Sequence, residues 1–512
     1  MQNKRDQVQA HMFLMSRLTS GILRSDPDAP ESPQGRTNRG IAIGVIVAVL
    51  VAVGAFIVGL VSPGKQNSWQ TSGGLIVDKG TGARYLYLDG RLRPVRNYTS
   101  AKLIGGAKLT TTTVSTISLK GTPRGTPVGI EGAPDELPAA GDLSRAPWQV
   151  CVTEAPRSGS TRTVTTLAVG LDSDGATLGR TQALLVAGPD GRDYLIWQGS
   201  RLRIDRDSPA GEALGYASVR PVPVSAAFLN ALPAGPDLAA PVIEGAGGAG
   251  PKLDGRPTRV GQLFTLAVPG AGERHYVLRA DGLAPLTATE LALLLADPRT
   301  RAKAYDGATP ASAVLTSDAL QGRLAPGTGR RGAETAPGRA PEVPPKAVSV
   351  PRHHAPCALV TPDGKGTRFG VALAPTAGLG PIAQHAAGVA AAACLPVDRV
   401  AVRPGRGSLV RLVGAGGGEL GGTIYLVTET GVKYRLATAA AVEALGYKDV
   451  TPGRMPALML AMLPSGPDLH PEAAEAGRAS VTAPRCTAQP SGDGAEAGDR
   501  PKSGAQDKEK TR

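Results

Sequence analysis

The longest apolar run in the chain covers residues 41–61. Its sequence, IAIGVIVAVLVAVGAFIVGLV, has 21 residues without a charged or strongly polar side chain. At about 1.5 Å per residue, a helix of this length spans roughly 31 Å, about one hydrocarbon core. The run is longer than the apolar part of a signal peptide, and no small-x-small cleavage site follows it. It predicts a single transmembrane helix that is not removed.

A second pattern precedes this run, because apolar residues recur at helical spacing near the N-terminus. One side of the predicted helix carries Val8, Met12, Met15, Leu18 and Ile22. We expect a short amphipathic helix that either contacts a partner or lies on an anionic membrane surface; a simple solvated helix is the alternative. Within the cytosolic segment 1–40, residues 25–40 have the polar, Pro-containing composition of a tether.

After the apolar run, one pattern recurs four times: an apolar strand, a polar turn with glycine, and a second strand. This succession is typical of β-hairpins. The four hairpins are predicted over residues 85–95, 194–204, 276–286 and 425–436. Each is followed by a short helical stretch, mostly opened by Ser or Thr, so each unit is predicted to be a β-β-α repeat.

Two of these repeats are nearly copies of each other. Residues 212–238 align without a gap to residues 443–469, at a constant offset of 231, with 15 identities in 27 positions. Such a match indicates an internal duplication. We therefore expect an α+β protein, in which an elongated outer domain of four repeats surrounds a central β core with quasi-two-fold symmetry.

The remaining segments complete this division of the chain. Strand-like stretches between the repeats predict the two halves of the central core, and Pro/Gly-rich stretches predict linkers. The predicted repeats are 62–120, 179–244, 258–320 and 419–471; the core halves are 121–178 and 347–418; the linkers are 245–257 and 321–346; and 472–512 is a disordered tail.

Composition supports small modules in place of one large enzyme body. The chain of 512 residues contains 67 Gly and 44 Pro, and only 4% of its residues are aromatic. The formal net charge is +13, but basic and aromatic residues are not interleaved in any one stretch, so we do not expect nucleic acid as a partner.

The residues around the span indicate its orientation. Arg24, Arg36 and Arg39 precede it, whereas Lys65 is alone for a dozen residues after it. Because basic residues favour the cytosolic side, this asymmetry predicts a cytosolic N-terminus and an extracytoplasmic C-terminal domain in the cell membrane.

The cysteines agree with this orientation, because all four follow the span and exported compartments permit disulfides. Cys151 ends one strand-like stretch and Cys357 starts its counterpart in the other half, so we expect these two to be joined. Such a bond would close a loop of about 206 residues and restrict the unfolded chain. Cys394 and Cys486 are a possible second pair, by elimination.

Complete catalytic motifs are not found. Residues 59–65 fit the spacing of a phosphate-binding loop, but Gln66 occupies the Ser/Thr position and the pattern starts inside the apolar run. His353 and His354 lie near Cys357 without a second ligand pair at zinc spacing. We therefore expect no catalytic residue, metal site or cofactor, although carboxylates distant in sequence could still pair.

The chain resembles the EccB family, the single-pass membrane subunit of the actinobacterial type VII (ESX) secretion system. The resemblance rests on QVQAHMFLMSRL before one span, then VRNYTSAKLI, PRGTPVGIEGAPDELP, and the endings LPAGPDL and LPSGPDL. It extends from about Gln7 to Glu472 and departs in the Gly/Pro-rich insertions, the tail, and the extra pair Cys394 and Cys486.

The resemblance implies a scaffold role. Family partners are the EccC motor ATPase, EccD and EccE, with a homo-oligomeric outer domain above the pore and contact with the cell wall as a further expectation. The family's core disulfide would fall on Cys151 and Cys357. Members are sometimes labelled ATPases; a nucleotide hydrolase or a cell-wall hydrolase is the alternative function, supported by no complete motif.

Overall fold

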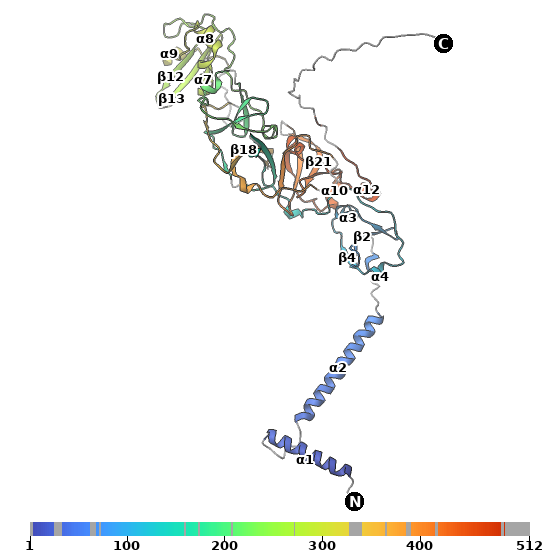
Figure 1. Cartoon of the computed structure of the whole chain (residues 1–512). Helices are drawn as coiled ribbons and strands as arrows, with labels where there is room; N and C mark the ends of the chain where they lie inside the picture. Colours follow the sequence, from blue (N-terminus) through green and yellow to red (C-terminus); the bar gives the residue numbers. More distant parts are fainter. Residues whose placement is uncertain are drawn as a thin grey trace, which may run out of the picture. The chain divides into compact units, whose positions relative to one another are not determined.

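The computed structural model (Figure 1) describes residues 4–24, 33–61, 68–70, 73–157, 160–172, 175–205, 208–270, 272–326, 340–363, 366–385, 391–414, 418–482 and 486. These form two compact units. The first comprises residues 1–71, 76–83 and 112–123, and the second comprises the rest.

The first unit contains two long helices. They are α1 (Lys4–Arg24) and α2 (Pro33–Val61). Residues 35–58 of α2 are long and apolar enough to cross a membrane, and none of that stretch is buried within the protein. Because α2 begins at Pro33, the second part of the expected tether is helical, which differs from the prediction. Pro at the first position suits a helix start, since its missing N–H would have no intrahelical partner.

The rest of the first unit is small. It holds η1 (Ser68–Gln70), α4 (Thr116–Leu119) and most of β1 (Leu75–Asp78) and β4 (Thr111–Val114). Asp78 is 2% exposed. Its carboxylate accepts hydrogen bonds from the Thr116 hydroxyl at 2.6 Å and from the Thr81 hydroxyl at 2.8 Å. These bonds compensate the burial of the carboxylate and attach the end of β1 to α4.

A six-stranded sheet forms the centre of the second unit. Its order is β19-β6-β5-β17-β18-β7. The strands are β5 (Trp148–Arg157), β6 (Ser160–Val169), β7 (Ala176–Thr177), β17 (His354–Asp363), β18 (Gly366–Pro375) and β19 (Arg399–Val402). Two ten-residue hairpins, β5–β6 and β17–β18, lie next to each other in the middle. The predicted β core is thus one sheet with strands from both halves of the chain.

All four expected hairpins are present. The first is β2 (Arg84–Leu88) with β3 (Arg91–Pro94), followed by α3 (Tyr98–Gly105). Its turn residues Asp89 and Gly90 both have positive φ, at 52° and 73°. Two such residues suit the tight turn that matches the right-handed twist of the strands. Asn97 then caps α3, accepting a hydrogen bond from the Ser100 N–H at 2.9 Å.

Three further sheets share a strand order in which the hairpin is joined by a preceding strand and a short following one. One contains β8 (Gln182–Ala187), β9 (Asp193–Trp197), β10 (Ser200–Ile204) and β11 (Val222–Pro223). The next contains β12 (Leu263–Val268), β13 (Gly272–Arg279), β14 (Gly282–Leu286) and β15 (Ala313–Val314). The last contains β20 (Ser408–Val413), β21 (Glu419–Val427), β22 (Lys433–Leu436) and β23 (Gly453–Pro456).

Short helices accompany these sheets. They are α5 (Ala210–Ala213), α6 (Ala226–Asn230), α7 (Ala288–Ala296), α8 (Pro298–Ala304), α9 (Ser317–Leu320), α10 (Ala439–Ala444), α11 (Ala457–Ala461) and α12 (Pro471–Ala476), with η2 (Ala140–Asp142) and η3 (Thr376–Leu379). In Figure 1, α7, α8 and α9 lie beside β12 and β13. The units are therefore richer than β-β-α, with a strand before each hairpin and a second strand and helix after it.

The structure corrects several predicted boundaries. Ser408–Val413, assigned to the central core, pairs with β21 and belongs to the fourth repeat. Within the expected linker 245–257, Leu253 is 3% exposed and packs with Phe264 and Leu278. Because burial of this apolar side chain stabilises the fold, residues around Leu253 are part of the third repeat and not a linker, despite their Gly and Pro content.

The second linker and the tail also begin or end elsewhere. Residues 346 and 347 form β16 (Lys346–Ala347), which pairs in parallel with β8. At the C-terminus, α12 is ordered by its His470 cap and by burial of Ala473 and Ala474. The tail expected from residue 472 is thus structured up to residue 482, whereas residues 487–512 lie outside the described residues.

Candidate functional site: a disulfide-joined central sheet

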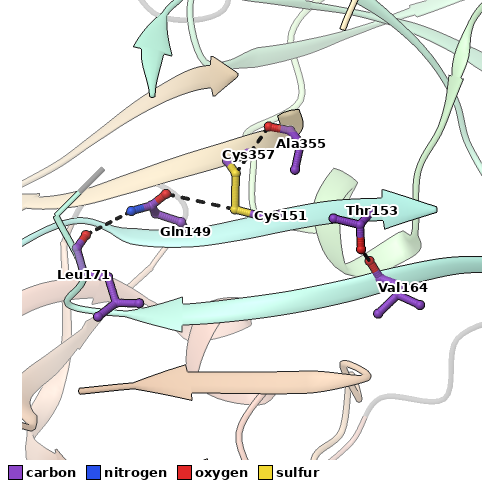
Figure 2. Close-up of a disulfide and its surroundings, with 7 residues drawn as sticks. All are labelled: Gln149, Cys151, Thr153, Val164, Leu171, Ala355 and Cys357. Atoms are coloured by element: carbon purple, nitrogen blue, oxygen red, sulfur yellow. Dashed lines mark hydrogen bonds between the residues drawn. A yellow bond between two sulfur atoms is a disulfide. The ribbon is translucent and has the colours of Figure 1, made fainter. Parts of the chain in front are cut away.

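The register of the two central strands brings Cys151 of β5 directly opposite Cys357 of β17. The two sulfurs are bonded, across a sequence separation of 206 residues (Figure 2). Both side chains are 0% exposed and pack with Ala355, Leu359 and Ala372. The adjacent Gln149 donates a hydrogen bond from its side-chain amide to the Leu171 carbonyl at 2.9 Å. The first and second halves of the chain are thus covalently joined at the centre of one sheet.

The main hydrophobic core beside this sheet also draws on both halves. Trp148 and Phe228 come from the first half, and Val360, Val410 and Met459 from the second; all five are 0% exposed. The Trp148 indole N–H donates to the Ser408 hydroxyl at 3.3 Å, which satisfies the buried ring nitrogen. Neither half can bury this core alone.

Two tyrosines make reciprocal hydrogen bonds between the halves. Tyr216 donates from its hydroxyl to the Pro345 carbonyl at 2.8 Å, and Tyr447 donates to the Pro138 carbonyl at 2.7 Å. Burial raises the pKa of Tyr216 to about 12 and also raises the pKa of Tyr447, so both stay protonated as donors. Each tyrosine belongs to a duplicated stretch, and each reaches a proline in the opposite half.

The second disulfide joins Cys394 to Cys486, with a sequence separation of 92 residues. The segment carrying Cys394 is held against the fourth repeat, because the Leu395 N–H donates to the Ala461 carbonyl at 3.0 Å. Asp468 receives hydrogen bonds from the Thr482 hydroxyl at 2.6 Å and from the backbone N–H of Thr482 at 3.3 Å. The C-terminal segment is therefore fixed at two points, to Cys394 before the fourth repeat and to Asp468 within it.

The predicted apolar side of α1 is exposed to solvent. Its five residues are exposed: Val8 59%, Met12 67%, Met15 54%, Leu18 58% and Ile22 80%. Phe13 and Leu14, which the helical spacing did not single out, are exposed as well, at 66% and 59%. So much exposed apolar surface on one helix is characteristic of a surface that contacts a partner or a membrane.

The structure also brings together carboxyl groups that are far apart in sequence. Asp135, Glu136 and Glu429 line a pocket of about 350 Å³, together with Tyr98 and Arg406. A hydrogen bond to Glu429, and repulsion from its charge, raise the pKa of Glu136. The Gly405 N–H donates to Glu429. Sequence spacing could not reveal this pair, since nearly three hundred residues separate its members.

The fold gives no further support to the other candidate sites from the sequence, the phosphate-loop pattern and the histidines near Cys357. Gly59–Val61 end α2, while Lys65 and Gln66, at the end of the phosphate-loop pattern, lie outside the described residues. His354 Nδ1 lies 3.0 Å from the Arg352 carbonyl. Among the described residues, no three His, Cys, Asp or Glu side chains are grouped as metal ligands would be.

Sequence reasoning missed the proline acceptors of the two tyrosines. Their signal is a second, fainter duplication: APDELP at residues 133–138 corresponds to APEVPP at residues 340–345, at an offset of 207. That offset nearly equals the 206-residue separation of Cys151 and Cys357. The two stretches therefore occupy matching places in the two halves, although the second was assigned to a linker.

The chain is similar to known proteins over most of its length. The family model "Type VII secretion system ESX-1, transport TM domain B" matches residues 2–483. The "ESX-3 secretion system ATPase EccB3" of Mycolicibacterium smegmatis is 31% identical over 91% of this chain and 89% of its own.

Two solved structures are similar in fold. The structure of an EccB3 dimer from the ESX-3 core complex has a TM-score of 0.62 and 28% identity, and the match covers 78% of this chain and 99% of that chain. A chain of an intact ESX-5 inner membrane complex has a TM-score of 0.62 and 22% identity, covering 96% of this chain and 98% of that one.

Proposed function

Since the chain belongs to the EccB family of type VII (ESX) secretion systems, we propose that it is a structural subunit of such a machine, anchored in the membrane by α2. The observation that carries the proposal is a contrast within the chain. The residues after the span form sheets and cores joined by disulfides, whereas α1 and α2 leave their apolar side chains exposed. Such an architecture suits a protein that offers binding surfaces to other subunits and does not need to catalyse a reaction.

The orientation that we propose puts α1 in the cytosol and residues 73–482 outside the cell. It is supported by Arg36 and Arg39 just before the apolar run, since basic residues favour the cytosolic side. The four cysteines, all after the span, are bonded in two disulfides. Disulfides persist in oxidising compartments, which supports the same orientation.

For α1 we propose a contact with other membrane subunits of the machine, namely the EccC motor ATPase, EccD and EccE. The exposed side chains of Met12, Met15 and Leu18 support this role. The similar EccB3 chain was solved as a dimer, and this supports a homo-oligomer for the outer domain. Contact of the outer repeats with the cell wall is a compatible further role.

We propose no catalytic role, although relatives carry the name ATPase. The spacing of residues 59–65 fits a phosphate loop, but this pattern begins within α2 and not between a strand and a helix. Gln66 also lacks the hydroxyl that would bind magnesium. The hydrolase alternative has one point of support, the carboxyl pair of Glu136 and Glu429.

Photo-crosslinking in intact cells tests the structural role. A photoreactive residue at Met12 or Met15 is expected to capture EccC, EccD or EccE. Arg17, about half a turn away on α1, is the control position and is expected to capture less. Adducts with lipid alone from Met12 and Met15 would contradict the proposal.

A rate measurement tests the alternative. The purified full-length protein is expected to hydrolyse neither ATP nor peptidoglycan above background. Turnover that survives stringent purification and is abolished by Lys65→Ala, or by Glu429→Gln for wall hydrolysis, would instead establish an enzyme.

A further inference from the structure

The positive charge of this chain is concentrated in its first repeat. Residues 73–130 contain nine Lys and Arg against two Asp and Glu. The corresponding numbers are six against seven for residues 179–244, six against six for 258–320, and five against five for 408–471. The other three repeats are thus nearly neutral, and the first has a large excess of cations.

In each of the neutral repeats, basic side chains are found in ion pairs with acidic ones. Arg203 pairs with Asp237 in the second repeat, Arg259 with Asp306 at 2.9 Å in the third, and Arg435 with Asp468 at 3.1 Å in the fourth. These pairs neutralise charge locally and leave little net field at the surface.

The first repeat has fewer of these acidic partners. Within the described residues, Arg84 is paired with Asp135 at 2.8 Å, whereas Arg91, Arg93 and Arg96 form no ion pair. The second and fourth repeats end in GPDL, whose Asp is the acidic partner; the matching stretch of the first repeat, residues 125–128, reads GTPV. Pro127 thus occupies the position of Asp237 and Asp468.

The unpaired arginines lie along one margin of the hairpin. The segment 124–128 runs parallel to β3, with bridges from Leu92 to Arg124 and from Val95 to Val128. Gly125 lies beneath two of the side chains, since a Cβ added there would be 2.9 Å from Arg93 Cγ and 3.7 Å from Arg91 Cβ. We call Arg91, Arg93, Arg96 and Arg124 the basic edge.

Hydrogen bonds fix part of this basic edge. Arg93 donates to the Thr126 carbonyl at 3.1 Å, and Arg124 donates to the Tyr85 hydroxyl at 2.9 Å with its guanidinium 5.2 Å from the centre of the ring. Arg91 and Arg96 have exposed side chains. The edge is therefore a row of cations, two of them held in place and two free to contact an anionic surface.

We propose that the basic edge binds the anionic phospholipid headgroups of the membrane that α2 spans. Thirteen residues, 62–74, connect the end of α2 to β1. At no more than about 3.5 Å each, they hold the start of the first repeat within about 45 Å of the end of the span. A connection of this length permits the arginines to meet the phosphates of the membrane surface, and guanidinium groups bind phosphate with two parallel hydrogen bonds.

This inference rests on the proposed anchoring by α2, and its test is designed to separate the two. Full-length protein is reconstituted in bilayers of zwitterionic lipid alone, or with about 30% phosphatidylglycerol. The four native cysteines are bonded, so an exposed Ala107→Cys substitution offers a single thiol for a fluorophore. Ala308→Cys, exposed in the third repeat, is the control label. A quencher is carried on the lipid headgroups.

Quenching of the label at position 107 is expected to be at least about twofold stronger in the anionic bilayer. It should fall to the zwitterionic value in 0.5 M NaCl, because surface interactions are screened within about 8 Å already at physiological salt. The label at position 308 should not respond to lipid charge. If both labels are quenched equally in the two bilayers, the proposal is wrong, while the reconstitution itself still verifies the anchor.

Two matched variants sharpen the test. Arg91→Gln/Arg93→Gln/Arg96→Gln removes three charges from the basic edge and is expected to abolish the effect of anionic lipid. Arg259→Gln/Arg274→Gln/Arg279→Gln removes three charges from the third repeat and should preserve it. Unchanged thermal unfolding and an intact Cys151–Cys357 bond verify that each variant folds. Quenching that instead depends on protein concentration, in either bilayer, would assign the edge to an acidic protein surface and overturn the proposal.

Discussion

The second and fourth repeats place different side chains on the same backbone framework. At the start of the second hairpin strand, the Arg201 N–H donates to the Pro233 carbonyl at 3.0 Å, and the Lys433 N–H donates to the Pro464 carbonyl at 3.0 Å. Arg201 and Lys433 therefore hold equivalent positions. The main-chain pairing that follows from the duplication is retained, so any difference between the repeats comes from side chains.

Those side chains have different surroundings. Arg201 donates to the Asn230 side chain at 3.0 Å and is half-buried. Lys433 is 4% exposed, and its Nζ donates to the Leu460 and Leu463 carbonyls, each at 2.6 Å, at the end of α11. A cation is favourable where carbonyls at a helix end lack partners. The comparison teaches that a duplicated backbone tolerates a buried charge when free carbonyls are present to bind it.

The largest effect should come from separating the two halves. Cys151→Ala/Cys357→Ala is expected to lower the free energy of unfolding by about 4–5 kcal/mol, because the bond closes the longest loop of the chain. Denaturant unfolding of the full-length protein in detergent, followed by tryptophan fluorescence, to which buried Trp148 contributes, measures this loss. Cys394→Ala/Cys486→Ala is the control and should cost less by up to about 1 kcal/mol, since its loop of 92 residues is shorter and the loss grows only with the logarithm of loop length. A larger loss for this control than for the central bond would contradict the prediction.

Lys433 should make the stability of the fourth repeat depend on pH, whereas the second repeat, with Arg201 at the equivalent position, should lack this dependence. Burial lowers the pKa of Lys433 to about 8 from its usual 10.5. Between these values the unfolded chain binds more protons than the folded one, so stability rises with pH. We expect a rise of up to about 2 kcal/mol from pH 8 to pH 9.5. Lys433→Met should remove it and Arg201→Met should not; the same slope in Lys433→Met would refute this assignment.

Substitution of the two GPDL aspartates should lower the free energy of unfolding by different amounts, because the two side chains are buried to different extents. Asp468 pairs with Arg435 at side-chain exposures of 7% and 30%, whereas Asp237 and Arg203 are 48% and 43% exposed. Asp468→Asn is expected to cost about 2 kcal/mol because it weakens a buried charged network. Asp237→Asn should cost less than about 1 kcal/mol. Thermal unfolding of both variants checks the order, and a larger cost at Asp237 would contradict it.

The most symmetrical effect on stability, and a small one, should come from the reciprocal tyrosines. Tyr216→Phe and Tyr447→Phe each remove one hydrogen bond, to Pro345 and to Pro138. Each change should cost about 1 kcal/mol, and the double variant should cost the sum. Denaturant unfolding of the three variants measures this. A much larger cost for one tyrosine would show that the two halves are not equivalent at this contact.

Local patterns were sufficient to predict the elements that depend on near neighbours. The hairpins follow from turns such as Asp89–Gly90, and α2 follows from a continuous apolar run. The boundaries that failed depend on distant partners: Ser408–Val413 belongs to the fourth repeat because it pairs with β21, and α12 is ordered because Ala474 is buried. Composition alone cannot identify such partners.

The amino-acid sequence by itself determined the apolar span, the duplication at residues 212–238 and 443–469, and the excess of cations in the first repeat. These are properties of the order of residues along the chain. Only the tertiary structure decided that Cys151 lies opposite Cys357, that Lys433 binds the carbonyls at the end of α11, and that Glu136 meets Glu429. Such pairings depend on strand register and helix ends, which form only when segments hundreds of residues apart are buried together.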